Sequence, residues 1–491
     1  MTSEVQMSHA SSAQEPPIDS RSRPWLIVFV LGFSSLSASL MQSLVIPIQS
    51  DLPALLHTSA SNTAWIVTAT LLGGAIAMPV AGRLADIHGK KALLVISSMI
   101  LLVGSLLAAL FGSFLVVLIG RILQGLAMGY IPVAISLVQE AVPPRMVNSA
   151  IATVSATLGV GGALGLPLAA WVFEVFDWHA LFWVSAILAA VMLVLSAAVL
   201  PRSTLKHPAP FDYAGAFGLS AALVAILVGV TKGNDWGWMS VPTVGIIVGG
   251  IIILALWGRY ELKHAAPLVD LRTTAKLPIL LTNIAALLVG FGMMTESIVI
   301  PQLLQAPTSV PHGLGQSVMA TGLWMAPAGF AMLAFSPISS MLLTRFGGRI
   351  TLAIGAMGVG LGYLLAVFMS DAPWKLMFVA SVASAGVGVG YAAMPTLILR
   401  HVPRKEAASS VGVNALMRSM GTTISGAVMA IVLVSSTMPV PGGEGQVPTR
   451  NAFLLAFAIG AAAAFLGGVL TLFIPREGRQ QPHVLECVNG S

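Results

Sequence analysis

The sequence predicts an all-α polytopic membrane protein, with two pseudo-repeated six-helix bundles plus two extra central helices, or fourteen transmembrane helices. Of its 491 residues, 56% are hydrophobic and only 9% are charged, and the mean hydropathy is +0.91. This apolar excess is larger than the core of a soluble domain can bury. Apolar runs of about 18 residues or more recur along the whole chain, and each is long enough to cross a bilayer. An internal repeat supplies the third observation.

The apolar runs define the predicted spans. Helices are the expected spanning element, because lipid offers no partners for backbone groups and the pattern does not alternate as in a β-barrel. The 49 glycines suit close helix packing in such a bundle. The spans lie at about 25–48, 64–84, 92–111, 115–137, 149–172, 180–200, 213–231, 241–258, 278–303, 316–343, 350–369, 374–398, 408–436 and 451–474.

The positions of Lys and Arg predict the orientation. With the N-terminus inside, 19 of the 24 Lys and Arg fall in cytoplasmic segments, and the outer loops hold only Lys232, Lys375 and Arg450. Arg121 and Arg418 lie within spans. Because cytoplasmic loops are enriched in basic residues, both termini are expected on the cytoplasmic side of the cell's inner membrane. The net charge of +6 is therefore a topology signal and does not indicate a nucleic-acid partner.

The repeat divides the chain into related halves. "PVAGRLADIHGKKALLVI" (79–96) aligns with "PISSMLLTRFGGRITLAI" (337–354), and Gly89 corresponds to Gly347. Duplicated halves of this kind place a substrate site near the bilayer midplane between them. The expected organisation is a disordered cytoplasmic N-tail (1–24), an N-terminal six-helix bundle (25–200), a linker with two extra transmembrane helices (201–277), a C-terminal six-helix bundle (278–475) and a cytoplasmic C-tail (476–491).

Several kinds of chemistry have no motif in this sequence. It lacks G-x-x-x-x-G-K-[ST], which argues against ATP-driven pumping by this chain. The nine histidines have no metal-ligand spacing, and the single cysteine, Cys487, lies in the polar tail. No Ser/His/Asp arrangement suggests hydrolysis. We therefore expect neither an enzyme nor a metal or cofactor site.

Three motifs resemble those of the major facilitator superfamily. "GRLADIHGKKA" (82–92) resembles its loop between helices 2 and 3, "RILQGLAMG" (121–129) its helix-4 motif, and "LGVGGALGLPLAA" (158–170) its helix-5 antiporter motif. The resemblance extends from about residue 25 to 475. Stretches similar to the fourteen-helix drug:proton antiporter branch are "FDYAGAFGL" (211–219), "GNDWGWMS" (233–240) and "HAAPLVDLR" (264–272).

The resemblance implies proton-coupled efflux, by alternating access, of lipophilic or amphipathic small molecules such as drugs or secondary metabolites. The expected partners are that substrate, protons and membrane lipid, the energy source is the proton motive force with no cofactor, and nothing demands more than a monomer. The sequence departs from the family pattern at Ile87, Ala169 and Ala170, and it has Ala38 where helix 1 often carries an acid. A proton-coupled importer and a non-transporting membrane sensor therefore stay open as alternatives.

Two motifs suggest moving parts. The resemblance implies that Asp86 docks against a helix N-terminus of the other half and acts as a conformational latch; the alternative is a solvated turn on the inner face. In helix 5, the family's antiporter motif implies a hinge, whereas small residues packing against a neighbour explain the same pattern. The latch residues are Gly82, Asp86, Gly89, Lys90 and Lys91, and the hinge residues are Gly161, Gly165 and Pro167.

Charged residues inside spans are candidates for proton coupling, because a charge at bilayer depth is costly and is usually functional. Arg121 either snorkels to the outer surface or lines a polar cavity tied to proton movement. Glu296 is the one acid clearly within a span and leads the candidates, the alternative being a wet carboxylate near the outer vestibule. Asp51, at the outer mouth, is a weaker candidate.

Polar and large side chains within the spans are candidates for the substrate cavity. Arg121 and Arg418 against Glu296 leave an uncompensated positive charge, which favours an anionic substrate or carbonyl and hydroxyl partners. The alternative for Arg418 is a hydrated position facing the inner cavity. The candidates are Gln124, Met294, Trp324, Met325, Asn414 and Arg418.

Overall fold

The computed structural model describes residues 23–45, 48, 51–202, 209–441 and 446–475. Residues 1–22 of the expected N-tail and all of the expected C-tail, including Cys487, lie outside the described residues. The helices of the N-terminal part are α1 (Pro24–Ser43), α2 (Leu52–Leu55), α3 (Ala60–His88), α4 (Lys90–Leu110), α5 (Phe114–Leu126), the 3-10 turn η1 (Ala127–Gly129), α6 (Tyr130–Ala141), α7 (Pro144–Val175) and α8 (His179–Val199).

The middle of the chain supplies α9 (Tyr213–Trp236), α10 (Val241–Glu261) and the short α11 (Leu271–Thr274). The C-terminal part contains α12 (Leu277–Gln305), α13 (Val318–Ala334), α14 (Ser336–Phe368), α15 (Pro373–Tyr391), α16 (Ala393–His401), the 3-10 turn η2 (Arg404–Glu406), α17 (Ala407–Ser435), the strands β1 (Thr437–Pro439) and β2 (Gln446–Pro448), and α18 (Arg450–Thr471).

The described helices account for fourteen crossings. Twelve helical stretches are long and apolar enough to cross a membrane, and the bent α7 makes a thirteenth. One of the twelve, Val318–Phe368, has 51 residues and would be about 77 Å long at 1.5 Å per residue, more than twice the ~30 Å hydrocarbon core. It is broken at Gly347, which has φ 78° and ψ 172°, so it provides two crossings. The predicted all-α, fourteen-helix fold class is confirmed.

The same glycine turn occurs in both halves. Gly89 separates α3 from α4 with φ 99°, and its repeat counterpart Gly347 separates two crossings with φ 78°. Both conformations strain any residue that has a Cβ atom. The aligned motifs therefore form equivalent tight turns.

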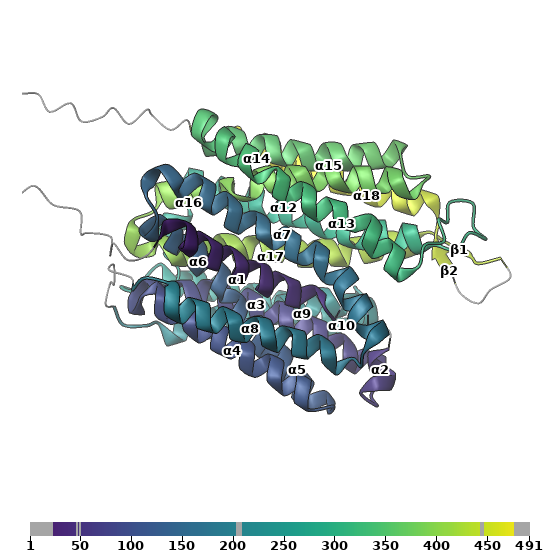
Figure 1. The fold of residues 1–491 in the computed structure, drawn as a ribbon, viewed down its shortest axis with the longest axis horizontal. Helices are drawn as coiled ribbons and strands as arrows, with labels where there is room; N and C mark the ends of the chain where they lie inside the picture. The colour runs from purple at the N-terminus through teal and green to yellow at the C-terminus, as the bar shows by residue number, and fades with distance from the viewer. Residues whose placement is uncertain (1–22, 46–47, 49–50, 203–208, 442–445, 476–491) are drawn as a thin grey trace, which may run out of the picture.

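In Figure 1, α1 to α6 and α8 lie in the lower part of the molecule and α12 to α16 and α18 in the upper part, with α7 and α17 between them. The extra pair, α9 and α10, packs together, and α9 also contacts α3 and α17, one helix from each half. Apolar side chains of this contact include Leu72, Leu223 and Leu416. The extra helices thus lie along the seam between the two halves.

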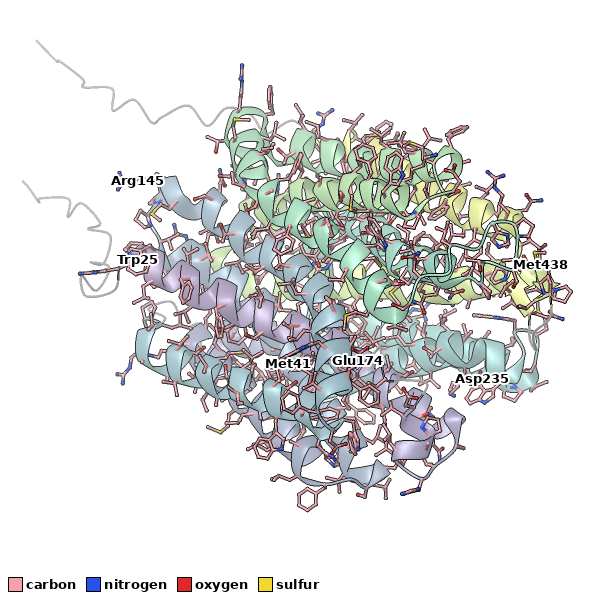
Figure 2. All side chains as sticks on the ribbon, turned by 45° about the vertical axis from the view of Figure 1, so that its right-hand side comes forward. Trp25, Met41, Arg145, Glu174, Asp235 and Met438 are labelled. Carbon is pink, nitrogen blue, oxygen red and sulfur yellow. The ribbon has the colours of Figure 1, made fainter. Side chains whose placement is uncertain are left out.

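The ends of the helices lie at two opposite ends of the molecule, as expected when successive helices run in opposite directions. Trp25 and Arg145 lie at one end of the molecule, and Asp235 and Met438 lie at the opposite end (Figure 2). Met438 belongs to a small hairpin in which β1 pairs antiparallel with β2. The sequence analysis did not predict this hairpin.

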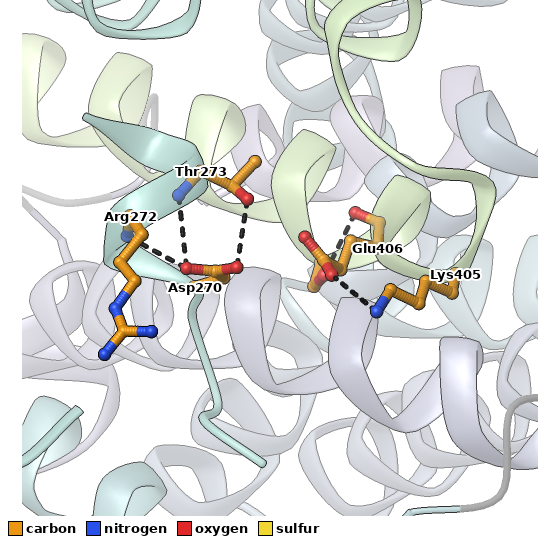
Figure 3. A network of polar contacts seen from close by, with 6 residues as sticks. Asp270, Arg272, Thr273, Lys405 and Glu406 are labelled. Carbon is orange, nitrogen blue, oxygen red and sulfur yellow. Dashed lines mark hydrogen bonds and ion pairs between the residues drawn. The ribbon is translucent and has the colours of Figure 1, made fainter. Parts of the chain in front are cut away.

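The loop after α10 and the turn before α17 are each held by polar contacts of their own. Asp270 caps α11 by accepting hydrogen bonds from the backbone N–H of Arg272 (2.9 Å) and Thr273 (3.1 Å), and Lys405 and Glu406 form an ion pair of 3.6 Å just before α17 (Figure 3). Leu268 and Val269 of this loop belong to the apolar cluster shared with α3 and α17. The linker therefore follows the seam at both α9 and its final loop.

Candidate functional site

Arg121 is buried inside the N-terminal half, with 1% of its surface exposed. Its Nε donates to the carbonyl of Ile66 (3.2 Å), and its Nη1 donates to Gln124 Oε1 (2.7 Å) and to the carbonyl of Met41 (3.4 Å). Gln124 in turn donates to Ser105 Oγ (2.9 Å). Each of these acceptors is neutral, so the three hydrogen bonds hold the guanidinium in place without neutralising its charge.

A cavity of about 140 Å³ lies between the two halves. Arg121, Gln124 and Met41 line a second, smaller cavity, and Gln42 and Met128 line both. The central cavity is lined from the N-terminal half by Ser39, Gln42, Leu71, Gly74, Met78, Met128, Ile131 and Leu158, and from the C-terminal half by Met293, Tyr391, Ala415, Arg418, Ser419 and Thr422. Its wall is mainly apolar, with a few polar groups, as is typical of small-molecule sites.

Arg418 is the charged group of the central cavity. Its guanidinium carbon lies 4.4 Å from the ring centroid of Tyr391 on α15, and 9% of the residue is exposed. Glycine at position 290 of α12 sets its position, since a Cβ there would lie 2.3 Å from the Arg418 carbonyl oxygen. The close approach of α12 and α17 thus holds Arg418 at the cavity wall.

Asp86 joins the two halves at the end of α3. Its carboxylate accepts hydrogen bonds from the backbone N–H of Ala408 (3.1 Å) and Ser409 (2.9 Å), in the first turn of α17, and the residue is 3% exposed. The N-terminus of a helix favours an anion, because its first N–H groups lack partners within the helix. One turn back, Gly82 lies against α17, where an added Cβ would be 2.4 Å from the Ala408 carbonyl oxygen.

The other residues of this motif hold the turn. Gly89 has the positive φ described above, and buried Lys90 forms an ion pair with Glu140 of α6. Lys91 is partly exposed. The motif therefore fixes α3, α4 and α6 together on the side where Asp86 meets α17.

The hinge candidates lie where α7 is bent. The stretches Pro144–Gly162 and Pro167–Val175 meet at 42°. Gly161 and Gly165 approach α1, since added Cβ atoms would lie 2.4 Å from the Leu36 carbonyl oxygen and 1.9 Å from Ser43 Oγ, respectively. Pro167 lies against Gly322 of α13, in the other half. Helix α7 thus contacts both its own half and the opposite one at its bend.

Glu296 lies within the C-terminal half and does not line the central cavity. It is 6% exposed, and Ser384 Oγ of α15 lies 3.0 and 3.3 Å from its two carboxylate oxygens. This position differs from a wet vestibule. Asp51, the weaker candidate, is exposed at the start of α2, outside the spanning helices.

The remaining cavity candidates lie away from the central cavity. Met293 lines it instead of Met294, Met325 is in the core, and Trp324 donates to Gln316 Oε1 (3.0 Å). Asn414 Nδ2 donates to Asn283 Oδ1 (2.9 Å), which joins α17 to α12.

Four residues that line the central cavity or contact a candidate residue were not predicted from the sequence, namely Gln42, Tyr391, Ser384 and Asn283. A polar residue inside an apolar span is a signal that could have found Gln42, Ser384 and Asn283. Within the described residues, no group of three or more His, Cys, Asp or Glu is placed to hold a metal ion.

The sequence resembles known transporters along most of its length. The profile of the Major Facilitator Superfamily matches residues 31–306 and 282–486. An uncharacterized transporter of that type from Mycobacterium tuberculosis is 26% identical over 386 residues, which are 78% of this chain, but the chain spans only 55% of that relative's length. The tetracenomycin C resistance and export protein of Streptomyces glaucescens is 23% identical over 91% of this chain and 84% of its own. The multidrug resistance protein Stp of M. tuberculosis is 25% identical, over 76% and 68%.

Solved structures of low sequence identity have a similar fold. The human organic anion transporter MFSD10 has a TM-score of 0.65 at 14% identity, covering 93% of this chain and 100% of its own. The proton:xylose symporter XylE has a TM-score of 0.61 at 15% identity, covering 92% and 96%. At these identities the likeness shows the fold alone.

Proposed function

Because the chain belongs to the Major Facilitator Superfamily, and is therefore a multi-pass membrane transporter and not an enzyme, we propose that it exports lipophilic or amphipathic small molecules in exchange for protons. The observation that carries the proposal is the central cavity, whose wall is built from both halves. A site shared in this way changes its access when the halves rock against each other, which is the basis of alternating access.

The cavity wall suits varied lipophilic molecules. Met78, Met128 and Met293 contribute to it from three different helices. Methionine is unbranched and polarizable, so such walls adapt to ligands of different shape. The names of two relatives, a tetracenomycin C export protein and a multidrug resistance protein, support drugs or secondary metabolites as the substrate class.

The contact of Asp86 with the first turn of α17, the predicted conformational latch, is the contact that changes during transport in this proposal. Its hydrogen bonds to α17 hold the two halves together at one end of the cavity, and access from that end requires them to break. Lys90 and Lys91, the first two residues of α4, lie at this end. We therefore assign the end to the cytoplasm by the positive-inside rule, with both chain termini on the same side and the protein acting as a monomer.

We assign proton coupling to Glu296, with Arg121 as the fixed charge of the N-terminal half. Within the part of the chain that the structure describes, this buried carboxylate is bound by the Ser384 hydroxyl and is paired with no cation that would hold it ionised. A proton taken up there from outside and released inside would drive the outward movement of substrate. Asp51 is the second candidate.

Everted membrane vesicles test this function. They are acidified by respiration and followed with a pH dye while lipophilic cations, neutral drugs and organic anions are added. We expect substrate-evoked proton release in the wild type, its loss in Glu296→Gln, and its persistence in the control Glu174→Gln, which changes an exposed carboxylate.

Other outcomes separate the parts of the proposal. Release that survives in Glu296→Gln keeps antiport but moves coupling to another group, with Asp51→Asn tested next. No response to any compound refutes proton-coupled efflux and leaves a proton-coupled importer or a non-transporting sensor.

A further inference from the structure

Arg418 has hydrogen-bond donors that nothing in the described residues uses. A guanidinium carries five N–H donors, yet the recorded contact of this side chain is its stacking over Tyr391. The residue is nine-tenths buried and borders the central cavity. These donors border the cavity, where a ligand that supplies acceptor oxygens can reach them.

Among the described residues, no acid lines the cavity to pair with that charge. None of the residues that line either cavity is Asp or Glu. Glu296 is bound to Ser384 within its own half, and Asp86 is bound to α17. Arg121, one wall away behind Gln42, adds a second positive charge whose hydrogen-bond acceptors are all neutral. The electrostatic potential in the cavity is therefore positive, and a cationic ligand would be repelled.

Two hydroxyls of the central cavity already donate to backbone carbonyls, so hydrogen bonds to an anion must come from other groups. Ser39 donates its hydroxyl hydrogen to the Leu158 carbonyl (2.5 Å), and Thr422 donates to the Ser419 carbonyl (2.7 Å). The side-chain amide of Gln42 borders both cavities and can donate. The cavity of about 140 Å³ is roughly ten times the ~10–15 Å³ that one water needs.

We propose that the exported molecule is an organic anion whose carboxylate or phenolate oxygen accepts hydrogen bonds from Arg418, while its apolar body lies against Tyr391, Met128 and Met293. Arginine matches this task because its planar fork can bind a carboxylate through two parallel hydrogen bonds. The inference rests on the proposed function, since it takes the central cavity as the substrate path. The inference restricts the proposed substrates, lipophilic or amphipathic small molecules, to those with a negative charge.

Binding to purified protein tests the charge preference without transport. Calorimetric titration in lipid nanodiscs compares three probes that share one ring system, 2-naphthylacetate, 2-naphthylacetamide and 2-(2-naphthyl)ethylammonium. We expect the wild type to bind the carboxylate at least ~10-fold more tightly than the amide or the ammonium, because removing one partner of a buried charge pair weakens binding by at least that factor.

Substitutions of Arg418 test whether this residue causes the preference for the carboxylate. Arg418→Gln is expected to lose the ~10-fold advantage of the carboxylate while its affinity for the amide stays within about threefold. Arg418→Lys should retain part of the advantage, because an ammonium supplies the charge without the fork. Arg345→Gln, which removes an exposed arginine of α14, is the matched control and should bind as the wild type does. Gel filtration of each variant checks folding.

The outcomes distinguish this inference from the proposed function. A carboxylate preference that survives in folded Arg418→Gln, or no carboxylate binding by the wild type, overturns the inference. If cations evoke proton release in vesicles and anions neither bind nor evoke it, efflux stands and the anion assignment is wrong. If the carboxylate binds through Arg418 but no compound evokes proton release, the anion site stands and proton-coupled efflux is wrong.

Discussion

Asp86→Asn should weaken the contact that we propose closes the cytoplasmic side of the cavity. The wild-type carboxylate accepts N–H groups from Ala408 at 3.1 Å and Ser409 at 2.9 Å. Hydrogen bonds to a charged group contribute about 1.5–3 kcal/mol each. An asparagine keeps one acceptor oxygen but turns an NH₂ donor toward the second backbone N–H. About one such bond is lost, and a change of ~2 kcal/mol raises the fraction of open molecules about 30-fold.

Cysteine labelling measures that opening. In a Cys487→Ser background, a Ser419→Cys reporter lies on the cavity wall, and everted vesicles expose the cytoplasmic side to a membrane-impermeant maleimide. We expect labelling to be about 30-fold faster in Asp86→Asn. Asp371→Asn, which changes an exposed aspartate paired with Lys375, is the matched control. A labelling rate of Asp86→Asn within twofold of the control rate would refute the assignment of Asp86 as the conformational latch.

Two further substitutions test neighbouring contacts. Gly82→Ala places a Cβ 2.4 Å from a carbonyl oxygen of α17 and should speed labelling of the same reporter, whereas Gly245→Ala, at a glycine with no atom near its added Cβ, should not; equal rates would contradict the close packing of α3 on α17. Lys90→Met removes the buried cation of the Lys90–Glu140 ion pair and should destabilise the protein by about 3–5 kcal/mol, which is measured as a lower melting temperature in detergent. The double variant in which Lys90 and Glu140 are exchanged should recover part of the lost stability. A melting temperature unchanged in Lys90→Met would count against the ion pair.

The number and position of the helices followed from the sequence because hydropathy and basic residues act locally. The structure joins residues 318–368 into one apolar stretch, but Arg345 and Arg349 beside Gly347 marked a turn between two spans. The repeat pair of Gly89 and Gly347 pointed to equivalent turns, because only glycine tolerates that backbone conformation without strain.

Side-chain partners could not be predicted in the same way. Successive helical residues point about 100° apart, so an error of one position moves a side chain to another face, as with Met293 in place of Met294. The stacking of Arg418 on Tyr391 and the hydrogen bond of Ser384 to Glu296 join residues of different helices. Such contacts depend on helix rotation and tilt, which periodicity leaves open. The β1–β2 hairpin was missed because its strands have three residues each, too few for a periodic pattern.

Transport by purified protein in proteoliposomes tests the central claim most directly. An imposed pH gradient, acidic inside, should drive an organic anion into vesicles through molecules whose cytoplasmic face points outward, and a protonophore should abolish the accumulation. Reversing the gradient should reverse the direction of net flux. Accumulation that ignores the gradient, or flux in which anion and protons move in the same direction, would contradict proton-coupled export.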